Sequence, residues 1–313
     1  MPNETLPTIL VVGSINMDLV VRTPHFPEPG ETVQGSSFQT SPGGKGANQA
    51  VAVARLGGRC RMIGRVGGDA FGKGLRDGLK ADGIDCDCVQ AVEDAPTGVA
   101  MIVVNSQGEN SIVISGGANL RLTPDDIFGC EEAFTGAAVL VLQLELPLPT
   151  VRAAVEVARR HGCKVILDPA PASRDLPREL YKVDILTPNA HEAEILTSTK
   201  AVEERMDKQV ASELVARGAS AAVLKLGARG CLVAMADGHF YTVPTYDVTV
   251  VDSTGAGDAF TGALALALAR GEHMHKAAKF ANAAGALACT RIGAQSAMPT
   301  AQEVGILMKD QPR

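Results

Sequence analysis

The residue types best suited to chemistry stand at 251–260, VDSTGAGDAF, directly before the apolar run TGALALALA. Gly255, Ala256 and Gly257 can present successive main-chain N–H groups at a helix start, where the positive end of the helix dipole attracts an anion. The carboxylate of Asp258 can cap that helix, or it can accept a proton from a hydroxyl at the rim of the anion hole. Because phosphoryl transfer needs both a base and donors that stabilise developing charge, the segment predicts a phosphoryl-transfer site.

A second glycine-rich segment lies at 41–58, SPGGKGANQAVAVARLGG. Gly44 precedes Lys45, and an apolar helical run follows with Asn48 in its first turn. Main-chain amides at a helix start allow close approach of a polar ligand, and Lys45 and Asn48 can hydrogen-bond hydroxyls. A flexible turn with a solvated lysine is the alternative, which this segment alone leaves open.

Two other nucleotide-binding patterns fail on their residues. GGDAFGKG at 67–74 nearly matches a P-loop, but Gly74 stands where the magnesium-binding hydroxyl is needed, and a helix is expected to begin near Asp69. GSINMD at 13–18 lacks the glycines of the dinucleotide fingerprint. The six histidines show neither metal-ligand spacing nor a Ser–His or Cys–His pattern.

Short apolar runs rich in β-branched residues alternate with helix-length segments. The expected strands lie at 8–14, 60–66, 137–143, 164–168, 183–189 and 221–227, and the expected helices include 46–57, 69–81, 150–162 and 203–217. Continuous apolar strands are buried on both faces. The alternation therefore predicts an α/β fold with a mostly parallel sheet covered by helices on both sides.

Polar residues follow several of these strands directly, where parallel sheets bind ligands. They are Asn16, Asp18, Glu145, Asp168, Asn189 and Gly227. Each alone is compatible with a solvated loop, but their shared position favours one common cleft.

The stretches 18–42 and 97–115 break the strand–helix rhythm. The first contains several Pro and Gly residues, and the second reads as a hairpin around the polar turn NSQGEN. They predict a small antiparallel sheet that serves as a lid over the site or as a dimer surface. With no repeat or clear linker, residues 1–313 are expected to form a single α/β domain with this lid.

The composition excludes several partners. The net charge is −6 with no basic block, which disfavours nucleic acid and anionic membrane surfaces. The start of the chain lacks a signal-peptide pattern, and the apolar run at 263–269 is too short to span a bilayer. Seven scattered cysteines without a C-x-x-C pair fit small buried hydrophobes in a reducing cytoplasm.

Four segments together resemble the ribokinase family of carbohydrate kinases, the PfkB type, from about Thr8 to Pro299. They are GSINMD (13–18), GGKGANQA (43–50), TPNAHEAEIL (187–196) and DSTGAGDAF (252–260). The two glycine-rich signatures are specific as a pair. Within the family, GGKGANQA, QLE (143–145) and TRIGAQ (290–295) resemble the ribose-phosphorylating branch.

The resemblance implies a ribokinase-like three-layer sandwich with a small β-sheet lid that often pairs in a homodimer. It implies ATP-dependent phosphorylation of the 5-hydroxyl of D-ribose, with Mg²⁺ and an activating K⁺. Asp258 would be the base, and Gly255, Ala256 and Gly257 the anion hole. Fructose, deoxyribose or a nucleoside as acceptor, and a non-catalytic sugar sensor, are the alternatives. The scarcity of aromatic residues disfavours the nucleoside, and an intact base and anion hole disfavour the sensor.

The family's other site residues carry over by position. The sugar would contact Asn16, Asp18, Gly44, Lys45, Asn48, Glu145 and Asp258. The nucleotide would contact Asn189, Lys225, Gly227, Gly230, Gly257 and Asn282. Glu192 would act on Mg²⁺ through water, and K⁺ would be held at Asp252, Thr254, Ala288, Arg291 and Gly293.

Two positions depart from the family pattern. Lys225 replaces a threonine, so an ammonium stands where a hydroxyl usually lies near the nucleotide phosphates. Lys225 would either contact phosphate or point elsewhere. Ala297 replaces the serine usual at the last cation position, which leaves main-chain carbonyls to complete the cation's coordination.

Overall fold

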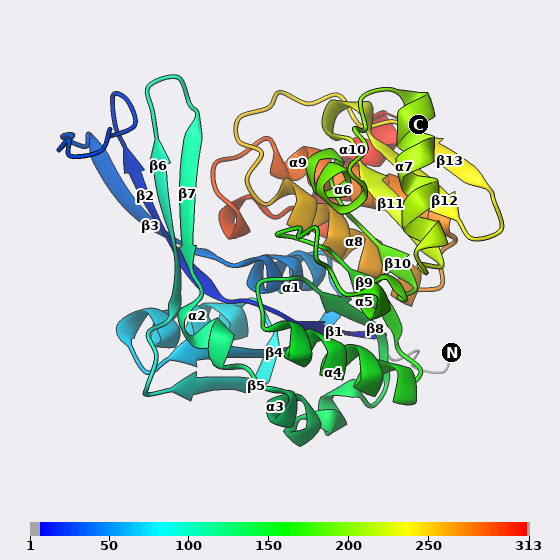
Figure 1. The fold of residues 1–313 in the computed structure, drawn as a ribbon, viewed down its shortest axis with the longest axis horizontal. Coiled ribbons are helices and arrows are strands. Elements are labelled where there is room, and N and C mark those ends of the chain that lie inside the picture. The colour runs from blue at the N-terminus through cyan, green and yellow to red at the C-terminus, as the bar shows by residue number, and fades with distance from the viewer. Residues whose placement is uncertain (1–6, 312–313) are drawn as a thin grey trace.

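The computed structural model describes residues 7–311, which contain two β-sheets (Figure 1). The large sheet has the order β13-β12-β11-β10-β9-β8-β1-β4-β5, parallel except at the β11–β12 and β12–β13 pairs. Its strands are β1 (Thr8–Val12), β4 (Arg59–Gly67), β5 (Asp85–Val92), β8 (Ala137–Leu142), β9 (Lys164–Leu167), β10 (Ile185–Leu186), β11 (Ala221–Lys225), β12 (Cys231–Met235) and β13 (Phe240–Val243).

The interior strand β1 shows why helices cover both faces of this sheet. All five of its residues are buried, and alternate side chains point to opposite faces. Ile9 and Val11 join one hydrophobic cluster, whereas Leu10 and Val12 join the other. The first cluster includes residues of α1 (Lys45–Arg55), α2 (Ala70–Ala81), α8 (Ala256–Ala269), α9 (Met274–Ala288) and α10 (Ala301–Asp310). The second includes residues of α3 (Pro124–Gly129), α4 (Leu148–Arg160), α5 (Arg178–Tyr181), α6 (Ala190–Thr197) and α7 (Glu204–Ala216).

The six expected strands and four expected helices are present, with one marked difference in length. The strand expected at 183–189 is reduced to β10, Ile185–Leu186. Pro188 has no N–H to donate to a neighbouring strand, and Asn189 already caps α6. Asp69 caps α2 by accepting from the Gly72 N–H, so the near-P-loop segment is an ordinary capped helix start.

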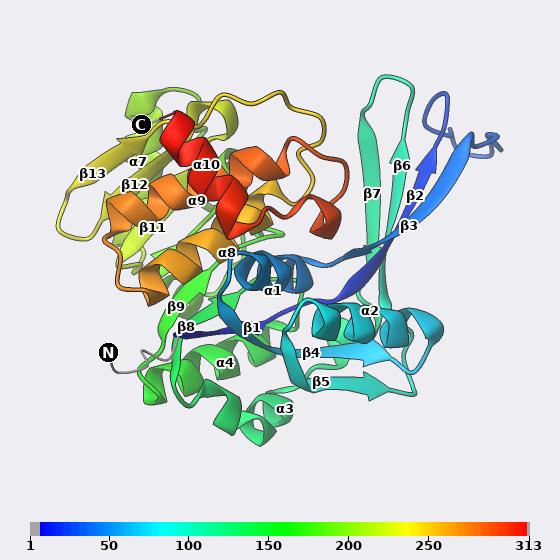
Figure 2. The same ribbon diagram turned by 180° about the vertical axis from the view of Figure 1, so that it is seen from behind.

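The small sheet stands apart from the helices and the large sheet (Figures 1 and 2). It has the order β3-β2-β6-β7, with strands β2 (Asn16–Arg22), β3 (Ser37–Gly43), β6 (Gly98–Val104) and β7 (Asn110–Ser115). The expectation of a purely antiparallel sheet is wrong, because its central pair β2–β6 is parallel. β2 follows β1 in the chain, and β6 follows β5. Because β1 and β5 run in the same direction, both segments leave the large sheet at the carboxyl ends of its parallel strands. Their extensions therefore run in the same direction.

Within residues 7–311, no helix is both long enough and apolar enough to cross a membrane.

Candidate active site

Helix α8 begins at a left-handed glycine, which sets the geometry of the site. Gly255 is the N-cap with φ 76°, a conformation that favours glycine, and no side chain caps the helix. The Ala256 N–H donates to the Ser253 carbonyl, so the three predicted anion-hole residues are not equivalent. The next N–H groups, from Gly257 and Asp258, lie in the first turn, where a helix provides no main-chain acceptor. They remain available to an anion.

The alternative that Asp258 caps α8 is wrong. Asp258 is the third residue of the helix, and only 5% of its surface is exposed. Its carboxylate turns away from the helix N–H groups and accepts two side-chain amides. Asn48 Nδ2 lies 2.9 Å from Oδ2, and Gln49 Nε2 lies 3.0 Å from Oδ1.

Burial raises the pKa of Asp258, while Lys45 and the two amides oppose that shift. A carboxyl pKa closer to neutrality improves a general base, because its proton affinity then approaches that of its task.

The predicted sugar-binding residues gather beside Asp258. Asn16 and Asp18 lie on β2 rather than in a loop after β1, and both are buried. Gly44 is the N-cap of α1, and the Lys45 N–H donates to Glu145 Oε2 at 3.2 Å. The Oδ1 atom of Asn48 is buried and has no hydrogen-bond partner among the described residues.

Three acids and one lysine dominate the electrostatics of this side of the site. Burial, with Glu145 and Asp258 nearby, raises the pKa of Asp18 to about 7. Burial also raises the pKa of Glu145. The pKa of Lys45 rises despite its burial, because Asp258 and other carboxylates surround it. Lys45 therefore stays charged while its acidic neighbours are held closer to protonation.

The predicted nucleotide residues line a separate pocket of about 430 Å³ on the other side of the α8 start. Five of the six contribute to its wall: Lys225, Gly227, Gly230, Gly257 and Asn282. The sixth, Asn189, is not a wall residue but pairs with Lys225 through an isolated parallel β-bridge. A pocket of this size, walled largely by small and apolar residues, is suited to a small-molecule ligand.

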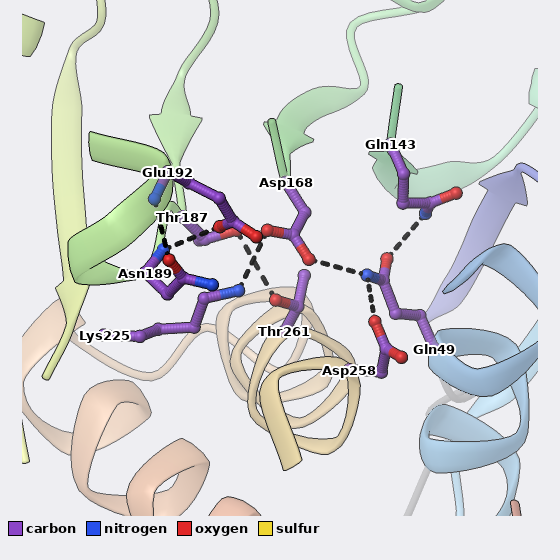
Figure 3. A network of polar contacts seen from close by, with 9 residues as sticks. All are labelled: Gln49, Gln143, Asp168, Thr187, Asn189, Glu192, Lys225, Asp258 and Thr261. Atoms are coloured by element: carbon purple, nitrogen blue, oxygen red, sulfur yellow. Dashed lines mark hydrogen bonds and ion pairs between the residues drawn. The ribbon is translucent and has the colours of Figure 1, made fainter. Parts of the chain in front are cut away.

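Lys225 points toward a carboxylate inside the protein. Its Nζ lies 2.9 Å from Oδ1 of Asp168, which is 1% exposed (Figure 3). A Cβ placed on Gly257 would lie 3.4 Å from the same Nζ, so the ammonium also borders the anion hole. Each alternative for Lys225 therefore has an observation behind it. The bond to Asp168 is an internal partner, and the position beside Gly257 would allow contact with a phosphate.

Asn189 and Glu192 form a reciprocal capping box at the start of α6. Asn189 Oδ1 accepts from the Glu192 N–H at 2.8 Å, and Glu192 Oε2 accepts from the Asn189 N–H at 2.7 Å. Burial raises the pKa of Glu192, with Lys225 opposing and Asp168 adding to the shift. A half-buried carboxylate that faces Lys225 and Asp168 is a suitable oxygen donor for Mg²⁺ or its water.

The predicted cation residues come from two segments, 252–254 before α8 and 288–293 at the end of α9, which meet at Asp252. Its Oδ1 accepts from the Thr254 N–H and hydroxyl, and its Oδ2 accepts from the Gly293 N–H at 2.8 Å. Ala288 ends α9, so its carbonyl lacks an intrahelical partner, whereas the Arg291 side chain pairs with Glu303 instead. Ala297 is buried nearby in a 3₁₀ turn (Gln295–Ala297).

The Asp252 carboxylate therefore lies beside the end of α9, whose last main-chain carbonyls have no intrahelical donor. Across residues 7–311, no group of three or more His, Cys, Asp or Glu side chains could hold a metal ion. The donor set fits a large monovalent cation such as K⁺ better than a transition metal.

Several side chains that hold this site together had no role assigned from the sequence, except that Asp168 was expected in the common cleft. Ser14 donates to Glu145, and Asn119 Nδ2 donates to Asn16 Oδ1 at 2.7 Å. Gln49 and Asp168 connect Asp258 to Lys225, and Gln143 donates to the side-chain oxygen of Gln49 (Figure 3). Only their positions in the sequence could have indicated a role: Gln49 and Gln143 stand inside family motifs, and Asp168 follows a strand.

Comparisons with known proteins show which family and which solved structures this chain resembles. The family described as pfkB family carbohydrate kinase matches residues 6–301. Ribokinase of Haemophilus influenzae is 40% identical over 296 residues, which cover 95% of this chain and 96% of that protein. Deoxyribokinase of Salmonella typhi is 38% identical over 296 residues, with coverage of 94% and 96%. The structure of Arabidopsis thaliana ribokinase complexed with ribose and ATP matches with a TM-score of 0.91 and 34% identity, covering 97% of this chain and 99% of that one.

Proposed function

The chain belongs to the pfkB family of carbohydrate kinases, and from that membership we propose that it transfers the γ-phosphoryl group of ATP to the 5-hydroxyl of D-ribose, giving ribose 5-phosphate and ADP. Its fold is the ribokinase-like three-layer sandwich with a small separate sheet. One observation carries the proposal beyond family membership. Gly257 lines the nucleotide pocket, while the next residue, Asp258, faces the sugar-binding side chains.

The first turn of α8 therefore lies between the nucleotide pocket and the sugar site, and the phosphoryl group is transferred past it. ATP in the pocket would present its γ-phosphate to the N–H groups of this turn, where the helix dipole favours negative charge. The sugar hydroxyl would lie between that phosphate and Asp258, which takes its proton as the bond to ADP breaks. Positioning and charge stabilisation supply most of the rate.

The sugar is held by groups whose free hydrogen-bonding capacity matches hydroxyls. Asn48 donates to Asp258 and keeps its Oδ1 available, while the carboxylates of Asp18 and Glu145 accept from hydroxyl donors. The charged Lys45 offsets the acidity of these neighbours. Closure of the small sheet over the sugar would keep water from replacing it as acceptor.

Two metal ions complete the proposal through residues already described. Mg²⁺ neutralises phosphate charge, and Glu192 would hold it through water. K⁺ would be bound by Asp252 and the carbonyls around it, and Thr254 would connect that site to Gly255. Asp252 itself joins the two segments by accepting from Gly293.

The proposed partners are ribose, ATP and a second copy of the chain. Support for a homodimer is the small sheet, whose strand β7 is exposed along its whole length and carries Ile112, Val113 and Ile114. The seven free cysteines in the described residues agree with the proposed cytoplasmic location.

A coupled assay that follows ADP release tests the acceptor. We expect turnover to be greatest with D-ribose among ribose, 2-deoxyribose, fructose and ribonucleosides. The likeness to a deoxyribokinase makes 2-deoxyribose the second candidate. Preference for deoxyribose would replace ribose in the proposal, and ADP release that no sugar stimulates would contradict it.

A further inference from the structure

Three buried side chains with no role in the proposed mechanism form a hydrogen-bonded network that reaches the carboxylate of Asp258 through one of them, Gln49 (Figure 3). Gln143 Nε2 lies 2.6 Å from Gln49 Oε1, and Gln49 Nε2 lies 2.9 Å from Asp168 Oδ2 and 3.0 Å from Asp258 Oδ1. Gln49 and Gln143 are completely buried, and Asp168 is 1% exposed. They stand on α1, after β8 and after β9, so three separate elements meet at the base.

The hydrogen-bond chemistry of these groups allows only one orientation of each amide. Ionised carboxylates can only accept, so the nitrogen of Gln49 must face both Asp168 and Asp258 and uses its two hydrogens on them. The oxygen of Gln49 then faces Gln143, whose own nitrogen must donate to it. Gln143 therefore supports the direction in which Gln49 donates, because it binds the amide oxygen that points away from the two carboxylates.

The carboxylate of Asp258 is consequently held at both oxygens. Gln49 donates to Oδ1 and Asn48 donates to Oδ2, which stops rotation of the carboxylate plane. The far end of the chain is fixed as well, because Lys225 donates to the other oxygen of Asp168 at 2.9 Å. The network thus connects the sugar side of the site to the wall of the nucleotide pocket.

We propose that Gln49 is a positioning residue for phosphoryl transfer: its amide, supported by Gln143 and anchored on Asp168, sets the direction in which Asp258 presents a free lone pair to the acceptor hydroxyl. The inference rests on the proposed function in taking Asp258 as the base. It does not depend on which sugar supplies the hydroxyl. Gln49 itself touches neither sugar nor phosphate in this assignment.

Loss of the Gln49 donor has a second consequence, which a merely structural role would not produce. The charged groups that surround Asp258 are Asp18 on β2, Lys45 on α1, Glu145 after β8 and Asp168, which Lys225 pairs from β11. Gln49 is one of the groups that oppose the effect of burial on the Asp258 carboxyl. Its removal should raise the pKa of Asp258 and move the acidic limb of the kcat–pH profile to higher pH.

Gln49→Met tests the inference, because methionine has similar length and volume but no amide. We expect kcat to fall by about 10- to 100-fold, as for a lost hydrogen bond to a charged group that orients a base. KM for the sugar should change far less, and the acidic limb should shift upward. Gln143→Met should lower kcat in the same direction by a smaller factor, because Gln49 keeps its donor but its amide oxygen loses the partner that holds it in place.

The matched control is Thr150→Val on α4, which removes a buried hydrogen bond from the Thr150 hydroxyl to the Leu122 carbonyl at 2.6 Å. It should lower thermal stability without changing kcat or the pH profile. Wild-type kcat and pH profile in Gln49→Met would overturn the inference. If that variant does not fold, an unchanged kcat in Gln143→Met would overturn it instead. Activity of the wild-type enzyme is measured first. If it phosphorylates no sugar, the proposed function is contradicted, and that result is distinct from the outcome of the variants.

Discussion

At the scale of single residues, the site is built around a base that is kept both buried and ionisable. Asp258 is shielded from water, yet each of its oxygens accepts a side-chain amide and Lys45 lies nearby. These groups stabilise the anion that burial would otherwise disfavour. The carboxylate can therefore be fixed in direction and still take a proton.

Replacing the base isolates its chemical role. Asp258→Asn keeps the shape of the side chain but removes its ability to accept the hydroxyl proton. We expect kcat to fall by about 10²- to 10⁴-fold, the usual contribution of a general base. Sugar affinity, measured by isothermal titration calorimetry, should be largely kept. Turnover near that of the wild type would mean that another group is the base.

The raised pKa of Asp18 makes a prediction about stability. An acid whose pKa rises on folding holds its proton longer in the folded state, so its contribution to stability falls as pH rises between 3.8 and about 7. The slope is at most about 1.4 kcal/mol per pH unit. Asp18→Asn removes this dependence, so the variant should gain stability over the wild type from pH 5 to pH 7.

Urea unfolding of both proteins without ligand at several pH values measures this gain. The same Asp18→Asn variant should lose sugar affinity, because an amide replaces the proposed hydroxyl acceptor. A difference in unfolding free energy that stays constant with pH would show that Asp18 titrates alike in the folded and unfolded chain. Together the two measurements test whether the site gives up stability for binding.

The candidate site was predictable from sequence only where a residue stands in a recognisable motif. Asp258 and Lys45 stand in glycine-rich segments whose residue types already indicate anion and hydroxyl binding. The bond from Gln49 to Asp258 joins residues 209 positions apart, and that from Gln49 to Asp168 joins residues 119 apart. No local pattern encodes such pairings, since they depend on how α1 and α8 pack.

At the scale of elements, the close packing of α1 against α8 brings Gln49 to Asp258. Gly262 of α8 makes that approach possible. A Cβ at this position would lie 2.8 Å from the Ala52 Cβ and 2.8 Å from the Gln49 carbonyl oxygen. The two helices would have to separate to accommodate it, and the base would lose its contacts on α1.

Gly262→Ala should therefore be destabilising, although alanine is normally the better helix former. We expect a loss of about 1–3 kcal/mol of unfolding free energy, as for overpacking in a core, together with a lower kcat. The matched control is Gly74→Ala in α2, where an added Cβ meets nothing within 4 Å. It should stabilise by about 0.5–1 kcal/mol. Stabilisation by both variants in urea unfolding would contradict the packing argument.

The elements of the large sheet could be predicted because burial on both faces leaves continuous apolar runs such as TILVV in β1. The small sheet shows the limit of such reasoning. Its strands could be located, but the parallel pairing of β2 with β6 follows from the directions of β1 and β5 in the large sheet. Strand direction in one sheet therefore depended on the topology of another.

At the scale of the whole molecule, the small sheet has two faces with different surroundings. Asp18 pairs with Ala100, which in turn pairs with Ile114, so these residues share the face that carries the sugar-binding side chains. Leu19, Met101 and Val113 share the opposite face through the same register. Met101 and Val113 are 48% and 59% exposed, and Ile114 is 48% exposed. Apolar side chains thus remain uncovered on both faces.

A second copy of the chain would cover these residues, and substitutions at adjacent positions on β7 test this whichever face is used. Ile112→Asp combined with Val113→Asp places one charge on each face of the strand. We expect the dimer to dissociate at least about 10-fold more readily, because a charge would be buried without a partner. Sedimentation equilibrium measures the change.

Ile306→Asp on α10, where Ile306 is 52% exposed and remote from the small sheet, is the matched control and should leave the assembly intact. Equal dissociation in both variants, or a wild-type protein that is monomeric at all concentrations, would contradict assembly through this sheet, and its apolar faces would then serve only closure over the sugar.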